Sequence, residues 1–422
     1  MRDERLPAFP VFFIPLVKKG MRIKILFLTA FVIVSCGLSE IGRRPHEGDD
    51  GVWTGPGTGA GSQDPGRASV YVTAMDYPAG YNWRTDPEKG SVKCSLVVFA
   101  DGSPVLKIPV GDVYEVSSDP ESHHMAGGHL YTDYSDGEQT VVRKDGKEIM
   151  RFLSDEKVCG LLVEDQDVYT LSHRKDSGGF RFRKNDEVLL ERPSGRTFGN
   201  LYHDGDSICF AFVETFEGGG DSLERYYHVA DGHTEQVALR EDVKKVWDVV
   251  SCKGKLYYLA SLIGIGPPVL FSEDKKFVLE MPYGVGILSG GIITDGEGLC
   301  VEGVFQVPGK IMQCGLWNRS GKLCVSWSGM SLASVCVDGD ALCCMVNRSA
   351  LASQGMIYRC GEVFDAPADY YSTGNGAVLM TRGMLHIGMS SLKGERPLVW
   401  KDGFSEEIKA HGFITSVSAV ED

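Results

Sequence analysis

The sequence predicts an all-β protein, a closed β-propeller of eight four-stranded blades that covers residues 69–422. Two observations predict this fold class. Short runs rich in Val, Leu, Phe and Tyr alternate with Gly, Asp and Asn pairs from Ser69 onward, and no amphipathic helical stretch of convincing length interrupts them. The turn pairs also recur at the period expected for one blade, about 40 to 45 residues.

Eight turn pairs of one kind set this period. They span 301 residues in seven intervals, a mean of 43 residues. Asp-Gly and related pairs favour two-residue hairpins, because the central positions of such turns need positive φ. The pairs are Asp101-Gly102, Asp145-Gly146, Asn185-Asp186, Asp231-Gly232, Asp274-Lys275, Ser320-Gly321, Cys360-Gly361 and Asp402-Gly403.

A second family of turns lies midway between the first and has seven members: Gly127-Gly128, Gln166-Asp167, Asp204-Gly205, Lys253-Gly254, Asp295-Gly296, Asp338-Gly339 and Asn375-Gly376. The missing eighth turn is explained if residues 413–420 form the inner strand of the blade whose next strand is residues 69–77. The two ends of the ring would then pair, which leaves no unpaired sheet edge at the seam. A seven-bladed ring with one irregular insertion is the alternative.

Residues 1–35 have the layout of a secretory signal peptide. A basic start from Met21 precedes an apolar run from Ile25 to Val34, which is shorter than the roughly 20 residues of a membrane-spanning helix. Met21 is a plausible true start. Residues 36–68, a cysteine followed by a segment rich in Gly, Pro and Ser, are predicted to be a lipidated cysteine and a flexible tether.

The residues Ile33-Val34-Ser35-Cys36 resemble the lipobox of bacterial lipoproteins, in which the cysteine is acylated. With the blade periodicity of residues 69–422, the chain resembles uncharacterised lipoprotein propellers of Gram-negative bacteria. The resemblance implies a lipid anchor on Cys36 and a place in the cell envelope, as an outer-membrane lipoprotein that faces the periplasm or the exterior. It implies no activity, because propellers support many unrelated functions.

The chain is acidic, with a formal net charge of −14. Residues 1–35 carry six Lys or Arg and two Asp or Glu, so their removal changes the charge from −14 to −18. Such a protein repels phosphate backbones and anionic lipid surfaces, so we expect no nucleic-acid partner. We expect a monomeric ring whose membrane contact is made through the N-terminal lipid.

Eleven cysteines follow Cys36, and most lie inside apolar strand-like runs, which favours buried thiols. An oxidising compartment permits disulfides, so a bond between Cys343 and Cys344 or between Cys314 and Cys324 is the alternative to free thiols. No spacing predicts a zinc site, and adjacent histidines on a strand point to opposite faces. We therefore expect no metal and no cofactor.

The longer connections gather on the face opposite the tight turns, and loops on a rigid frame are where binding usually occurs. Aromatic and ionisable side chains lie on these connections and at the starts of inner strands, where flat rings beside polar groups suit sugars and peptide side chains. The candidate ligand-binding residues are Trp83, Arg84, Tyr114, His123, His124, Trp247, Tyr370 and Tyr371. The stretch Val246-Trp247-Asp248 is interpreted as the start of an inner strand and not as a repeat signature.

No motif of nucleophilic, zinc-dependent or nucleotide chemistry is present in its required context. The first hypothesis is therefore a lipid-anchored scaffold that binds a protein, peptide or glycan through its long-loop face. The alternative is a polysaccharide hydrolase or lyase with its site at the channel mouth. Two carboxyl groups, or a His with a Tyr and an Arg, converging in one channel pocket would favour it. A third hypothesis, a subunit of an envelope assembly, predicts a large exposed apolar patch on the ring rim.

Overall fold

The computed structural model describes residues 53–54, 69–85, 92–110, 123–135, 139–174, 178–218, 221–264, 266–273, 275–282, 286–348 and 355–420. The predicted signal peptide, Cys36 and Tyr114 lie outside these residues. Within the described ranges, no helix has the length and hydrophobicity needed to cross a bilayer.

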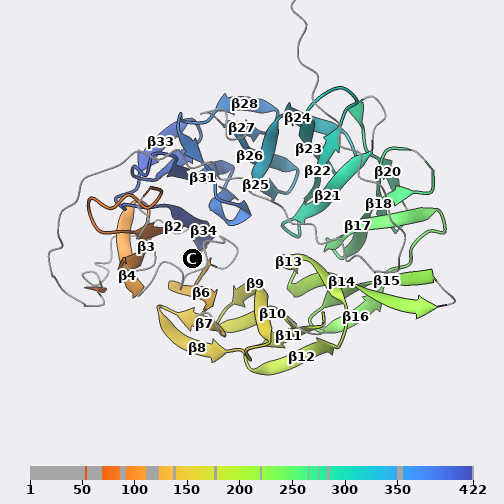
Figure 1. Cartoon of the computed structure of the whole chain (residues 1–422), viewed down its shortest axis with the longest axis horizontal. Helices are drawn as coiled ribbons and strands as arrows, with labels where there is room; N and C mark the ends of the chain where they lie inside the picture. The colour runs from red at the N-terminus through yellow and green to blue at the C-terminus, as the bar shows by residue number, and fades with distance from the viewer. Residues whose placement is uncertain are drawn as a thin grey trace, which may run out of the picture. The chain divides into compact units, whose positions relative to one another are not determined.

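Eight antiparallel blades stand in a ring, all within the compact unit Asp50–Asp422 (Figure 1). The protein is thus an eight-bladed β-propeller, as the spacing of the turns predicted. Given from the inner strand outward, the first four blades are β34 (Ile414–Val420), β2 (Ser69–Asp76), β3 (Cys94–Ala100) and β4 (Ser103–Val110); β5 (His123–Ala126), β6 (His129–Ser135), β7 (Thr140–Lys144) and β8 (Lys147–Arg151); β9 (Glu156–Glu164), β10 (Asp167–Arg174), β11 (Phe180–Lys184) and β12 (Glu187–Arg192); and β13 (Arg196–Asp204), β14 (Ser207–Gly218), β15 (Asp221–Ala230) and β16 (His233–Gln236).

The other four blades continue around the ring in chain order. They are β17 (Val243–Cys252), β18 (Lys255–Leu262), β19 (Val269–Ser272) and β20 (Lys276–Val278); β21 (Ile287–Thr294), β22 (Leu299–Gln306), β23 (Met312–Asn318) and β24 (Leu323–Ser328); β25 (Met330–Asp338), β26 (Ala341–Arg348), β27 (Met356–Arg359) and β28 (Glu362–Asp365); and β29 (Tyr370–Tyr371) with β30 (Val378–Thr381), β31 (Met384–Ser391), β32 (Leu398–Lys401) and β33 (Phe404–Glu407). A further short strand, β1 (Trp53–Thr54), pairs with the outer edge of β4.

The first family of predicted turns joins the third and fourth strands of the blades. Six residues other than glycine adopt φ between 43° and 53° at these hairpins: Asp101, Asp145, Asn185, Asp231, Cys360 and Asp402. The predicted positive φ is therefore present at six of the eight pairs, and Gly321 of a seventh pair has a positive φ of 81°. Asp274 of the remaining pair lies outside the described residues. These hairpins and those between first and second strands define the turn face, and the opposite face, where the inner strands begin, is the long-loop face.

The prediction of a hairpin at Asn375-Gly376 was wrong. These residues form a short 3₁₀ helix, η5 (Asn375–Ala377), between the two pieces of the last inner strand. The hairpin to β31 is instead made by Arg382 and Gly383, whose φ values are 51° and 72°. An Asn-Gly pair suits any tight turn of the backbone, so it does not by itself specify a hairpin.

The first blade is completed by the C-terminal strand, as predicted. β34 pairs antiparallel with β2, with Ser69 opposite Val420 and Val72 opposite Val417. The Thr415 hydroxyl also donates a hydrogen bond of 3.1 Å to the carbonyl oxygen of Thr73. The ring is therefore closed by strands from its two ends.

The hydrophobic core is distributed around the ring. Eight clusters of buried side chains lie one between each pair of neighbouring blades. Between the fifth and sixth blades, for example, Leu259 and Leu270 pack with Phe305 and the fully buried Trp317. The cysteines from Cys94 to Cys360 are free thiols, and seven of these eleven are buried within this core.

A β-bulge recurs near the start of the inner strands. The ladder register skips one residue in five of them: Cys159 in β9, Trp247 in β17, Leu288 in β21, Ala333 in β25 and Thr415 in β34. A bulge leaves its extra residue unpaired and changes the direction of the neighbouring side chains. The residues that follow the bulges are Gly160, Asp248, Ser289, Ser334 and Ser416, so Asp248 is the ionisable member of this set.

Candidate functional site

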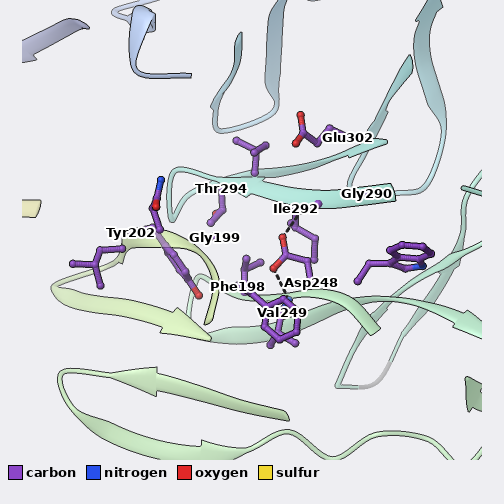
Figure 2. Close-up of a pocket in the computed structure, with 15 residues that line it drawn as sticks. Phe198, Gly199, Tyr202, Asp248, Val249, Gly290, Ile292, Thr294 and Glu302 are labelled. Atoms are coloured by element: carbon purple, nitrogen blue, oxygen red, sulfur yellow. Dashed lines mark hydrogen bonds between the residues drawn. The ribbon is translucent and has the colours of Figure 1, made fainter. Parts of the chain in front are cut away.

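A cavity of about 550 Å³ lies on the inner strands of the fourth, fifth and sixth blades. Bulges or register shifts in β13, β17 and β21 accompany it, and Gly199 in β13 has a positive φ of 54°. We call this cavity the acidic chamber, after Asp248 and Glu302 in its wall (Figure 2). Its lining consists of residues 198–202, 247–250, 290–294 and Glu302.

Asp248 connects two blades through its carboxylate. Its Oδ1 accepts a hydrogen bond from the backbone N–H of Val249 and its Oδ2 accepts one from Ile292 in the next blade, each at 2.8 Å. Burial raises the pKa of Asp248 to about 7; the two N–H donors act in the opposite direction, and the charge of Glu302 raises it further. Asp248 therefore exchanges its proton near neutral pH.

Glu302 reaches the same region from β22, where it lies opposite Gly291 of β21. A Cβ atom on Gly291 would lie 3.4 Å from Asp248 Oδ2 and 3.6 Å from Glu302 Oε1, so these two oxygens are at most about 7 Å apart. In the view of Figure 2 the two carboxylates lie on either side of the β21 ribbon. Burial raises the pKa of Glu302 as well.

Neither carboxylate has a cationic partner among the residues that the structure describes. Glu156, a carboxylate in another blade, shows the contrast. It is fully buried in the third blade, forms an ion pair with Arg181 and contacts Arg183 at 3.0 Å. A buried carboxylate is costly unless it is paired or hydrogen-bonded. Asp248 is held by its two backbone N–H donors, and among the described residues neither its carboxylate nor that of Glu302 has a side-chain cation beside it at the cavity wall.

Aromatic side chains complete the acidic chamber. Trp247 lines the wall, and its indole Nε1 is buried without a hydrogen-bond partner. The Lys245 Nζ lies 3.4 Å from the centroid of the Trp247 ring, a cation–π contact. On the other side, Tyr202 accepts a hydrogen bond of 2.8 Å at its hydroxyl from the backbone N–H of Ser251. The wall therefore combines flat apolar surfaces with carboxylates.

A second cavity, of about 360 Å³, shares Gly290, Gly291 and Glu302 with the first. Its remaining lining includes the side chains of Val304, Met312 and Leu332. We call it the apolar chamber. Met312 begins β23 after one of the long connections, so this chamber lies toward the long-loop face.

Three of the sequence-predicted residues meet elsewhere, at the seam between the eighth and first blades. The Arg84 guanidinium lies over two rings, 5.4 Å from the centroid of Trp83 and 5.3 Å from that of Tyr371. Trp83 also packs against Phe413, with ring centroids 5.1 Å apart. Burial raises the pKa of Tyr371, and Arg84 acts in the opposite direction. This trio covers the closure of the ring, so it also has a packing role.

The remaining candidates do not join either group. His123 is buried at the start of β5, and the neighbouring His124 is half-buried. The Tyr370 hydroxyl donates a hydrogen bond to the carbonyl oxygen of Arg396 at 3.1 Å. Trp247 alone of the predicted residues lines the acidic chamber. In the described ranges, no three His, Cys, Asp or Glu residues converge as they do around a metal ion.

Sequence reasoning missed Asp248 and Glu302. Asp248 was set aside with its neighbours as the start of an inner strand, and it does lie on the inner strand β17. Once the structure supplies the bulges, aligning five blades on them singles out its carboxylate among glycine and serine at the equivalent positions. Glu302 lies on a second strand, and no repeat position marks it.

Comparison with protein-family models and with curated proteins gives no match. Solved structures match at low similarity. The β-propeller domain of the trilobed protease from Pyrococcus furiosus is 10% identical with a TM-score of 0.43, over 70% of this chain and 94% of that one. The acylaminoacyl peptidase of Pyrococcus horikoshii is 11% identical with a TM-score of 0.43, over 76% and 57%.

A prolyl endopeptidase matches at 11% identity with a TM-score of 0.40, over 73% of this chain, and the chain spans 51% of the length of that enzyme. Peptidases and a peptidase propeller domain are thus among the solved structures that match this chain at low similarity. Similarity at this level carries no information about activity.

Proposed function

We propose that this protein is a binding propeller whose ligand enters from the long-loop face and contacts the acidic chamber. The single observation that carries the proposal is the pair of carboxylates, Asp248 and Glu302, that stand without cationic partners beside a cavity of about 550 Å³. A well-formed cavity with convergent polar groups of perturbed pKa is where ligands usually bind.

The lining supports a ligand that has both flat apolar and polar surfaces. Trp247 contributes aromatic surface to the wall, and Tyr202 and Phe198 add more. Aromatic side chains bury large apolar areas while their polar atoms fix orientation. This composition is consistent with the peptide or glycan ligands that the sequence predicts.

The test is a combined glycan and peptide array probed with the full chain. We expect at least one class of spots to be bound, and Trp247→Ala and Glu302→Gln each to weaken this binding about tenfold or more, which corresponds to about 1.4 kcal/mol. Arg84→Ala, at the seam between the eighth and first blades, is the control and should leave the bound spots unchanged. Binding that depends on Arg84 but not on Glu302 would place the site at the seam and contradict the proposal.

The presence of two carboxylates in one cavity wall supports a second candidate function, cleavage of a glycosidic bond. Inverting glycosidases hold their carboxyl groups about 6.5 to 9.5 Å apart and retaining ones about 5 to 5.5 Å. The limit of about 7 Å between Asp248 Oδ2 and Glu302 Oε1 allows either. Asp248, with a pKa of about 7, would protonate the leaving oxygen, while Glu302 activates water or attacks the sugar carbon.

This candidate is tested by release of reducing ends from a panel of polysaccharides. We expect wild-type turnover to fall by at least about a hundredfold in both Asp248→Asn and Glu302→Gln, since general acid or base assistance contributes about 10² to 10⁴ in rate. Turnover that survives either substitution, or no turnover of any polysaccharide, would rule this chemistry out and leave binding as the function.

The cellular setting of this proposal rests on the sequence. A lipid on Cys36 would hold the ring at a membrane of the cell envelope, because two or more acyl chains together make release slow. Incorporation of labelled palmitate into wild-type protein but not into Cys36→Ser checks this part independently of ligand binding.

A further inference from the structure

The two chambers differ in chemistry but share a wall. Gly290, Gly291 and Glu302 line both, so a ligand can extend from one into the other. The acidic chamber contains the carboxylates of Asp248 and Glu302. The apolar chamber contains Val304, Met312 and Leu332. The site is therefore divided into an anionic half and an aliphatic half.

The anionic half is suited to a cation. Two carboxylates at most about 7 Å apart repel each other, and in a partly buried site their interaction with a cation is stronger than in water. Gly291 has no side chain, so the position of its missing Cβ, which is 3.4 Å from Asp248 Oδ2 and 3.6 Å from Glu302 Oε1, is not filled by this residue. An ammonium or guanidinium group that packs on the Gly291 backbone would therefore have both carboxylates as neighbours.

The aliphatic half continues onto the surface. Met312 is 53% exposed, and the adjacent Ile311 is 62% exposed and lies against Gly329 at the start of the seventh blade. Leu288, the bulge residue of β21, is 53% exposed. Large aliphatic side chains at the mouth of a cavity favour an apolar ligand group.

We propose that the ligand is a peptide segment in which a Lys or Arg residue lies next to a large aliphatic residue. The basic side chain enters the acidic chamber between Asp248 and Glu302, and the aliphatic side chain occupies the apolar chamber beside Met312. This inference rests on the proposed binding function and specifies its ligand. A neutral glycan would leave both the charge and the aliphatic surface without a partner, whereas neighbouring residues of a peptide supply the two groups together.

The probe is a library of N-acetylated, C-amidated hexapeptides with random flanks around a central basic–aliphatic pair, retained on immobilised full-length protein and identified by mass spectrometry at pH 8. We expect peptides with Lys or Arg beside Leu, Ile or Met to be enriched at least about tenfold over the input library. Acetylation of the lysines, which removes their charge, should abolish the retention of the Lys peptides.

Two substitutions separate this inference from a general effect on folding. Glu302→Gln conserves shape and removes one charge, and Gly291→Ala fills the space between the carboxylates at ordinary contact distances of 3.4 Å or more. Each should reduce enrichment at least about tenfold. The matched controls are Glu235→Gln on the exposed outer strand β16 and Gly266→Ala, which meets no atom within 4 Å; both should behave as wild type.

The outcomes distinguish this inference from the proposed function. Equal retention of acetylated and free lysine peptides, or capture of neutral glycans that depends on Glu302, would overturn the inference. The proposed binding function of the acidic chamber would still hold. If no molecule of any class is retained in a way that depends on Glu302, both the inference and the proposed function are overturned. Lowering the pH from 8 to 5.5 should also release basic peptides, because the pKa of Asp248 is about 7 and its protonated form does not attract a cation.

Discussion

Val417→Asp is expected to abolish the cooperative folding of the ring. Val417 is 5% exposed and packs with Val70, Val72 and Ile414 where β34 meets β2. An aspartate there would bury a charge without a partner, at a cost above about 4 kcal/mol, and domains of this kind are stable by only about 5 to 15 kcal/mol. Urea unfolding monitored by circular dichroism, with hydrogen exchange of β2 and β34, measures the effect.

Val420→Asp is the matched control for this substitution. Val420 is the last residue of the same strand and is partly exposed, so the same new charge remains hydrated and should cost less than about 1 kcal/mol. If the two variants unfold at the same urea concentration, the pairing of β34 with β2 contributes little to stability. The ring would then fold without needing the pairing of its two end strands.

The second large effect is a loss of stability between pH 4 and pH 7 that depends on Asp248. Its pKa is about 7 in the folded protein against an ordinary value of 3.8, so the folded state holds the proton more tightly. The stabilisation is complete below about pH 4 and is lost as the pH rises toward 7. The slope is at most about 1.4 kcal/mol per pH unit, or about 4 kcal/mol in total.

The measurement compares urea unfolding of wild type and Asp248→Asn at half-unit steps from pH 4.5 to 8. The variant lacks one acceptor for the N–H groups of Val249 and Ile292, so we expect it to be about 1 to 3 kcal/mol less stable at low pH but less dependent on pH. Glu302 and Tyr202 face the same carboxylate, so Glu302→Gln should shift the wild-type profile toward lower pH. Parallel profiles for wild type and Asp248→Asn would show that Asp248 is ionised in the folded state.

The architecture was predictable because it depends on local turn chemistry repeated many times. Asp-Gly pairs need positive φ wherever they occur, so their spacing gave the blade period without knowledge of any tertiary contact. The closure followed from counting, since one family of turns lacked a member. The error at Asn375-Gly376 arose because the last inner strand is split into β29 and β30, which no local signal in the sequence indicates.

The candidate site was less predictable because it depends on register. Trp247 was identified from its residue type and its place near the start of an inner strand. Whether Asp248 faces the cavity is decided by the bulge one residue before it, and a shift of one residue sends a strand side chain to the other face. Glu302 reaches the site from the neighbouring strand β22, where it lies opposite Gly291 of β21. Such pairings become visible only when the strands are aligned.

The direction of the strands in the first blade determines which opening of the ring is directed away from a tether. Inner strands run from the long-loop face to the turn face, and Ser69 pairs with Val420, the last residue of the inner strand β34. The described chain of the ring therefore begins and ends at the turn face. A tether that left the ring at Ser69 would pull from that side, and the opposite opening, toward which the apolar chamber lies, would be directed away from the point of attachment. Large or immobile ligands could then approach the site without passing between the ring and the surface that holds it.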